Sequence, residues 1–319
     1  MVKLYDEDMT GYIEVEVKDF YCNDYPNHFA RTGKQTYVRW LGEEIYTVPR
    51  MLFGSMPRDG GNLLLSPEER DELIAKNPTA AKWIRPFVGA REFIHKLPRY
   101  CLWLVDCPPN ELRRMPLVYQ RVQAVRDFRL ASKAEPTRKF AATPWLFCQI
   151  AQPTTNYLLF PRHSSERREY IPIGYMDANI ICGDANLMVP GAMYWHFGVL
   201  TSYPHMAWMR ATCGRLKSDY RYSADVVYNN FPWPPFNREV ELTAAEILFA
   251  RSKYPDASFA DLYDPLIMPK DLRKAHAAND RAVLEAYDLP LNITEEQLQK
   301  ELFKMYKSLR DFDEFYQSL

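Results

Sequence analysis

The sequence predicts an α+β protein, in which a mixed or antiparallel sheet with flanking helices is followed by an all-α C-terminal domain. Two patterns carry this prediction. Short β-type runs separated by Pro, Gly, Asn and Ser fill residues 145–228, and helical periodicity fills the chain after Pro235. We therefore predict an extended lead-in over residues 1–50, a sheet-containing domain over 51–235 and a helical domain over 236–319.

The lead-in and the first helix are predicted from local patterns. GYIEVEVKDF, residues 11–20, alternates apolar and charged residues with the period of a half-buried strand. SPEERDELIAK predicts a helix, because Ser66 is a good N-cap, Pro67 fits the first turn and Glu69 can complete a capping box. RYCLWLVD, residues 99–106, predicts a buried strand.

A second helix is predicted over MPLVYQRVQAVRDFRLASK, residues 115–133. Its apolar side chains form one stripe, and its arginines are expected on other faces. The stripe consists of Val118, Val122 and Val125, and the arginines are Arg114, Arg121, Arg126 and Arg129.

The predicted sheet consists of four β-type runs and is interrupted by one helix near HMAWMRATC, residues 205–213. The runs are WLFCQI (145–150), YLLFPR (157–162), REYIPIGYM (168–176) and NIICGD (179–184). Three helices are predicted after the sheet, and their start signals are Thr243 with Glu246, Pro269, and Thr294 with Gln297. The apolar stripe of the last helix, formed by Leu298, Leu302, Met305 and Leu309, indicates that it packs against the rest of the protein.

A proline-rich connector separates the sheet pattern from the helical pattern. Proline cannot donate to a strand ladder and disrupts a helix interior, so this stretch is predicted to be rigid and extended. Its aromatic rings can hold it against both neighbouring domains. The connector comprises Asn230, Phe231, Pro232, Trp233 and Pro234.

The charge is unevenly distributed, although the whole chain carries a net charge of only −1. Residues 91–222 hold 18 Lys and Arg against 10 Asp and Glu, a net charge of +8, whereas both flanking segments are acidic. A basic segment between acidic flanks is typical of a polyanion-binding module. Chance clustering of solvated faces would produce the same asymmetry.

The sequence indicates no complete active site. It contains no G-x-G-x-x-G motif, no phosphate loop and no C-x-x-C pair, and its six histidines are isolated from one another. DCPPN (106–110) and EVK (16–18) only faintly match a methyltransferase loop and a nuclease metal site. We therefore predict no catalytic residue and no metal site in this chain. The six cysteines indicate reduced thiols, and the N-terminus lacks a signal-peptide pattern, so we expect a bacterial cytoplasmic location without membrane contact.

Two polar, basic stretches remain as candidates for binding. FPRHSSERREYIP (160–172) and RATCGRLKSDYRYS (210–223) both supply arginines beside small polar residues. In the second stretch, odd-numbered positions would share one face of a strand, with Tyr220 and Tyr222 facing the core. Arginine can bind guanine O6 and N7 as a fork, and aspartate can accept from the cytosine amino group. A salt-bridged solvent face would show the same spacing.

Several long motifs resemble the C-terminal half of type IIL (MmeI-like) restriction–modification proteins and related class II DNA methyltransferases. They are MLFGSMPRDGGNLLLSPEERDEL, WIRPFVGAREFI, SSERREYIPIGY, FGVLTSYPHMAWMRATCGRLKSDYRYSADVVYNNFPWP and LRKAHAANDRAVLEAYDL. The resemblance implies that residues 51–235 form a DNA target recognition domain. It also implies that residues 1–50 lead in from a methyltransferase core, and that residues 236–319 form the terminal helical domain.

The resemblance further implies a role in which this chain positions double-stranded DNA for adenine-N6 methylation. S-adenosylmethionine would bind a catalytic domain that lies outside this chain, and no cofactor is expected within it. The predicted base-reading residues are Arg215, Lys217, Asp219 and Arg221, and the predicted phosphate-binding residues are Arg162, Arg167, Arg168 and Arg210.

Two other functions stay open at this point. The basic stretches would also suit a protein–protein interaction module without DNA binding, in which the helical domain mediates assembly. A self-sufficient methyltransferase would require cofactor binding by this chain alone.

Overall fold

The computed structural model describes residues 48–317, and side chains up to residue 309. Its strands are β1 (Leu52–Phe53), β2 (Leu64–Leu65), β3 (Ile84–Val88), β4 (Tyr100–Leu102), β5 (Tyr157–Pro161), β6 (His163–Ser164), β7 (Gly174–Met176), β8 (Ile181–Cys182), β9 (Asn186–Pro190), β10 (Gly214–Leu216) and β11 (Asp219–Arg221). Its α-helices are α1 (Pro67–Lys76), α2 (Ala90–His95), α3 (Pro109–Arg113), α4 (Pro116–Leu130), α5 (Glu135–Lys139), α6 (Tyr194–Leu200), α7 (Tyr203–Thr212), α8 (Arg238–Ser252), α9 (Phe259–Leu262), α10 (Lys270–Ala286) and α11 (Glu295–Gln317). Short 3-10 helices span Pro78–Trp83 and Phe140–Ala142, and a π-helix spans Ala224–Tyr228.

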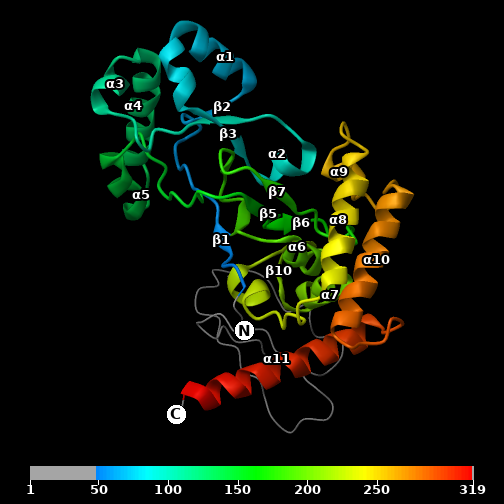
Figure 1. Cartoon of the computed structure of the whole chain (residues 1–319). Helices are drawn as coiled ribbons and strands as arrows, with labels where there is room; N and C mark the ends of the chain where they lie inside the picture. Colours follow the sequence, from blue (N-terminus) through cyan, green and yellow to red (C-terminus); the bar gives the residue numbers. More distant parts are fainter. Residues whose placement is uncertain (1–47, 318–319) are drawn as a thin grey trace.

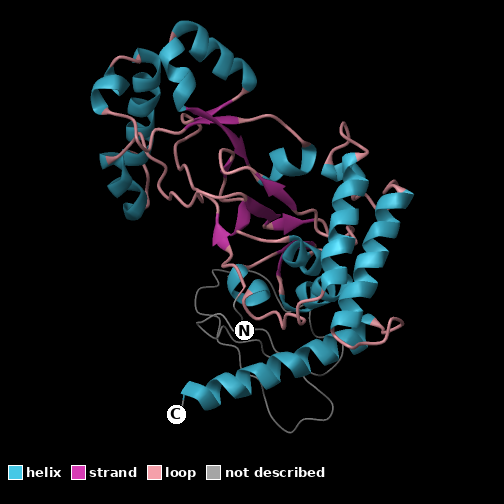
Figure 2. Cartoon of the chain, in the orientation of Figure 1, coloured by secondary structure: helices cyan, strands magenta, loops and turns pink. Residues whose placement is uncertain are grey.

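The described strands form three sheets, with orders β1-β9-β5-β7, β10-β11-β6 and β2-β4-β3-β8. All pairings are antiparallel except the parallel pair of β3 and β8. Figure 2 shows helices at both ends of the molecule and strands between them. This arrangement confirms the predicted α+β class with a mixed sheet region and a helical C-terminal region.

The first lobe contains α1, α3, α4 and α5 and the sheet edge formed by β2 and β4 (Figure 1). Val118, Val122 and Val125 of α4 are buried in its core, as predicted. The same stripe continues to Arg129, which is fully buried, so the prediction that this arginine lies on another face is wrong. Its guanidinium donates to the carbonyl oxygens of Arg58, Phe140, Thr143, Pro57 and Leu146.

The second lobe joins the β1-β9-β5-β7 sheet to α6, α7 and the C-terminal helices. Helices α8 and α10 lie side by side along one flank, and α11 runs beneath α7 (Figure 1). One hydrophobic core contains Phe160 from the sheet, Trp208 from α7, Ile247 from α8 and Leu302 from α11. Side-chain packing is therefore continuous across residue 235, where we predict the domain boundary.

The connector lies inside this shared core. Asn230 donates to the carbonyl oxygens of Asp225 and Val226, and Phe231 and Trp233 are buried. The Tyr287 hydroxyl of the segment after α10 donates to the Pro232 carbonyl at 2.6 Å. Pro234 is also buried, so the connector contacts the elements on both of its sides.

Several helix starts follow the predicted local chemistry. Ser66 and Glu69 exchange capping-box hydrogen bonds at the start of α1, and Thr294 and Gln297 do the same before α11. The predicted start at Thr243 is wrong, because α8 begins at Arg238 with Asn237 as its N-cap. Thr243 lies inside α8 and donates to the Glu239 carbonyl.

Some predicted strands are shorter than expected. RYCLWLVD forms a strand only over Tyr100–Leu102, and WLFCQI contributes one isolated bridge through Gln149 instead of a strand. The predicted strand at residues 11–20 lies outside the described residues.

Candidate nucleic-acid interface

The four predicted base-reading residues lie on a hairpin rather than on one continuous strand. β10 and β11 pair antiparallel, and Lys217 in the turn has a left-handed φ of +57°. The ladder sets Arg215 opposite Tyr220 and Leu216 opposite Asp219. Because cross-strand partners share a face, Arg215 lies on the face opposite Asp219 and Arg221. The prediction that Arg215, Lys217, Asp219 and Arg221 share one face of a strand is therefore wrong.

Arg215 covers the tyrosine face of the hairpin. Its guanidinium lies 4.2 Å from the ring centroid of Tyr220, which is buried as predicted. It also donates to the Ser218 carbonyl at 2.9 Å and lies 3.9 Å from the Glu166 carboxylate. These contacts indicate that Arg215 supports the hairpin from its core side.

The opposite face of the hairpin carries Arg221 and a histidine beside it. β6 adds to β11 so that His163 lies opposite Arg221, and Arg162 directly precedes β6. The pKa of Arg162 is lowered by burial and then by Arg221, and the pKa of His163 is lowered by burial, Arg162 and Arg221. No sequence pattern singles out His163, since only the β6–β11 pairing brings it to Arg221.

Part of the Arg162 side chain is engaged in contacts within the protein. Its guanidinium lies 5.0 Å from the Phe53 ring centroid and donates to the Asp184 carbonyl at 3.2 Å. Its Nε is buried and has no hydrogen-bond partner among the described residues.

The loop after β6 lies beside the hairpin. Asp219 Oδ1 accepts from the Glu166 backbone N–H at 3.3 Å. Within the loop, the backbone N–H of Arg168 donates to the Ser165 carbonyl at 3.2 Å. Arg167 is exposed. Arg168 is half-buried, and burial lowers its pKa although Asp219 and Asp264 act in the opposite direction. The structure therefore brings Arg167 and Arg168 to the same region as Asp219.

Arg210 differs from these arginines because its guanidinium forms an ion pair within the protein. It lies on α7, and its Nε and Nη2 donate to the two carboxylate oxygens of Glu295 at 2.7 and 2.9 Å. Because this bidentate pair occupies the guanidinium, we remove Arg210 from the predicted phosphate-binding set.

Further positive charge lies in the first lobe. Arg113, Arg114, Arg126 and Lys133 are exposed on or beside α3 and α4. The positive charge of residues 91–222 is therefore divided between this lobe and the β10-β11-β6 sheet.

The described residues contain no cluster of three or more His, Cys, Asp or Glu side chains that could hold a metal ion. His205 is buried, its Nε2 lies 2.9 Å from the Tyr222 hydroxyl, and burial lowers its pKa to about 3. Asn110 of the DCPPN stretch accepts from its neighbour Glu111 N–H on the surface. No helix among the described residues is long and apolar enough to cross a membrane.

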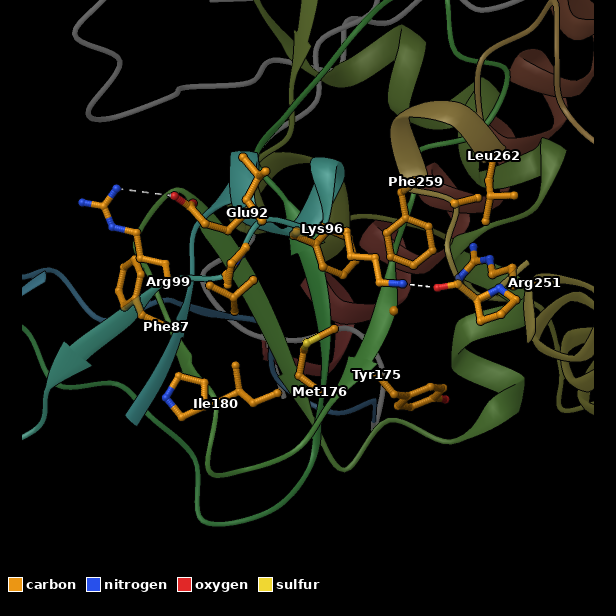
Figure 3. Close-up of a pocket in the computed structure, with 18 of the residues that line it drawn as sticks. Phe87, Glu92, Lys96, Arg99, Tyr175, Met176, Ile180, Arg251, Phe259 and Leu262 are labelled. Carbon is orange, nitrogen blue, oxygen red and sulfur yellow. Dashed lines mark hydrogen bonds and ion pairs between the residues drawn. The ribbon is translucent and has the colours of Figure 1, made fainter. Parts of the chain in front are cut away.

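A cavity of about 800 Å³ lies elsewhere, between α2, β7 and the helices α8 and α9 (Figure 3). Its lining is mainly aromatic and aliphatic. Lys96 donates to the Pro255 carbonyl, and Arg251 donates to the Tyr263 hydroxyl, so these two cations have partners within the protein. None of the hairpin residues lines this cavity.

The amino-acid sequence matches the family described as "MmeI, target recognition domain" over residues 32–235 and that described as "MmeI, C-terminal domain" over residues 234–312. DNA methyltransferase A of Bacillus subtilis (strain 168) is 35% identical over 301 residues, covering 93% of this chain and 34% of the relative. A solved structure of the type IIL restriction-modification enzyme MmeI in complex with DNA matches with a TM-score of 0.84 and 44% identity, covering 86% of this chain and 37% of that one. The chain thus spans about a third of the length of these relatives.

Proposed function

Since the chain belongs to the MmeI target recognition domain family, we propose that it recognises a specific double-stranded DNA sequence on behalf of a DNA methyltransferase. The DNA would contact the β10-β11-β6 sheet and residues 165–170, which we call the recognition surface. The DNA-bound state of the similar MmeI structure supports this proposal.

The observation that carries the proposal is a group of cations without ion pairs. Within the described part of the chain, Arg167, Arg168, Lys217 and Arg221 form no salt bridge within 4.0 Å, although acidic residues lie nearby. A salt-bridged solvent face would pair most of these charges. Cations that lack internal partners can neutralise phosphates and release counterions when a duplex binds.

We assign roles according to the geometry of the hairpin. Lys217, Asp219 and Arg221 lie at the turn and on the outer face, so they would read base edges. Arg167 and Arg168 would bind phosphates, assisted by Arg162 and His163. Arg215 would support the hairpin through Tyr220.

The methylation chemistry belongs, in this proposal, to a catalytic domain outside these residues. That domain would bind S-adenosylmethionine, flip the target adenine out of the duplex and methylate its N6 atom. The similarity to DNA methyltransferase A supports the methyltransferase assignment, and the resemblance of the motifs supports adenine-N6.

Duplex binding measured by fluorescence anisotropy over a salt titration tests the proposal, with a randomised duplex pool used first to select the preferred sequence. Each lost phosphate contact should reduce the slope of log affinity against log salt by about 0.9. The Arg167→Ala/Arg168→Ala variant should therefore lose nearly two units of slope. Arg238→Ala serves as the control, since Arg238 is exposed on α8 and pairs with Glu241.

Absence of duplex binding at low salt would contradict the proposal and favour an interaction module. A wild-type affinity that does not change with salt would also contradict it.

A further inference from the structure

The loop that carries Arg167 and Arg168 is held at both ends. At its first end, the Glu166 N–H donates to Asp219 of the hairpin. At its second end, the Tyr170 hydroxyl donates to Asp280 Oδ2 of α10 at 2.7 Å. Tyr170 follows Arg168 by two positions, and a fully extended chain spans at most about 7 Å over two residues. The position of Tyr170 therefore restricts the position of Arg168.

Asp280 connects the loop to a second element. Its Oδ1 accepts from the Tyr203 backbone N–H at the start of α7, at 2.6 Å. One carboxylate thus ties the 165–170 loop to the helix that leads directly into the hairpin. Tyr170 itself is 5% exposed, so this hydrogen bond is made at the edge of the core.

A further chain of contacts holds the same segment. The Tyr170 ring stacks on His276 with centroids 4.1 Å apart, and His276 Nε2 lies 2.8 Å from the Tyr263 hydroxyl. Arg251 of α8 donates to that hydroxyl and, through Nη1, to the Ile173 carbonyl at 2.7 Å. The C-terminal helices therefore contact both Tyr170 and the backbone just before β7.

An exposed ion pair adds a further link. Arg273 of α10 lies 2.9 Å from the Glu169 carboxylate, next to Tyr170 in the sequence. Exposed pairs contribute little to stability, so we assign the main positioning role to the buried contacts.

We propose that Tyr170 and Asp280 are positioning residues for DNA recognition, because their hydrogen bond fixes the loop that carries Arg167 and Arg168 beside the hairpin. The inference rests on the proposed function and extends it to the C-terminal helices, which lie outside the recognition surface. A loop that is ordered before binding loses less conformational entropy when the duplex binds. Loosening Tyr170 should therefore weaken DNA binding through these two arginines.

The test compares wild type with Tyr170→Phe, which keeps the ring and its stacking but removes the hydroxyl. We expect roughly 5- to 10-fold weaker binding to the preferred duplex, about 1 to 1.4 kcal/mol, together with a smaller salt slope. The measurement is made at about pH 8, because burial raises the pKa of Asp280 to about 7 and its carboxylate should be ionised. A melting temperature close to wild type separates this effect from unfolding.

Tyr254→Phe is the matched control. The Tyr254 hydroxyl donates to Asp271 at 2.7 Å, the same length as the Tyr170 bond, and it joins the end of α8 to α10 without touching the loop. We expect this variant to bind DNA as wild type does.

Two combinations distinguish positioning from a general loss of stability. Tyr170→Phe should add nothing to the Arg167→Ala/Arg168→Ala variant, and Asp280→Asn should not add to Tyr170→Phe. This inference would be overturned if Tyr170→Phe bound DNA as wild type does, or if it weakened binding equally in the Arg167→Ala/Arg168→Ala variant. The proposed function would stand in either case, as long as the wild-type protein binds the duplex. Loss of wild-type binding would instead overturn both.

Discussion

Arg221 lies directly across the antiparallel ladder from His163, and both side chains leave the sheet on the face opposite Tyr220. Burial, Arg162 and Arg221 hold the pKa of His163 below its usual value of 6.5. His163 is therefore neutral at pH 7 in the free protein. A DNA phosphate in this position would raise that pKa, because a nearby negative charge favours the imidazolium form.

We expect duplex binding to tighten as the pH falls from about 7.5 to about 5.5, because the complex then takes up a proton on His163. The sign follows from a higher pKa in the complex than in the free protein. His163→Gln should remove this tightening while the hairpin stays folded. The difference between the two proteins isolates His163, because Asp280, with a pKa of about 7, titrates in both. Affinity measured across the pH range checks the prediction, and an equal pH dependence in His163→Gln would contradict it.

Replacing Arg221 by alanine should weaken binding to the preferred duplex by about 1–3 kcal/mol and relax the preference at one base pair. Asp219→Asn should relax a different position, while its amide oxygen can still accept from the Glu166 N–H. Affinities for a panel of single-base-pair substitutions provide the measurement. Equal weakening on every sequence would make these residues backbone contacts.

Arg210→Ala should destabilise the protein by roughly 1–3 kcal/mol, because it leaves Glu295 without its bidentate partner. Its salt slope for duplex binding should match wild type. Urea denaturation and the salt titration give the two quantities. A reduced slope with normal stability would return Arg210 to the phosphate-binding set.

Arg129→Met should destabilise the first lobe by more than about 3 kcal/mol, because several buried carbonyl oxygens lose their donor. Arg126→Met on the same helix is the matched control, since Arg126 is exposed. It should change stability by less than about 0.5 kcal/mol. Similar losses in the two variants, measured by thermal denaturation, would refute the role given to Arg129.

Features that depend on a few neighbouring residues could be predicted from the sequence. The Ser66–Glu69 and Thr294–Gln297 capping boxes form because both partners lie within one helical turn. The burial of Val118, Val122 and Val125 follows from helical spacing in the same way. Fold class was predictable because it combines many such local patterns.

Features set by distant partners could not be predicted. Glu295 lies 85 positions from Arg210, and His163 reaches Arg221 only through a strand pairing. The prediction that Arg215 and Arg221 share a face assumes one uninterrupted strand. The turn at Lys217 breaks the alternation of side chains that such a strand would have. The sequence predicts a site on two segments, and the structure pairs these segments through β6 and β11. The directions of their side chains could be seen only in the structure.

The core that continues across Trp233 has a practical consequence for exchanging specificities between relatives. A hybrid spliced at Pro235 would combine Trp195 and Trp208 from one parent with Ile247 and Leu302 from another, across a single close-packed interior. It would also separate Tyr170 from its native Asp280. Donor segments should therefore include the helices up to α11. Their upstream splice should precede β1, because β1 pairs with β9 and β3 pairs with β8.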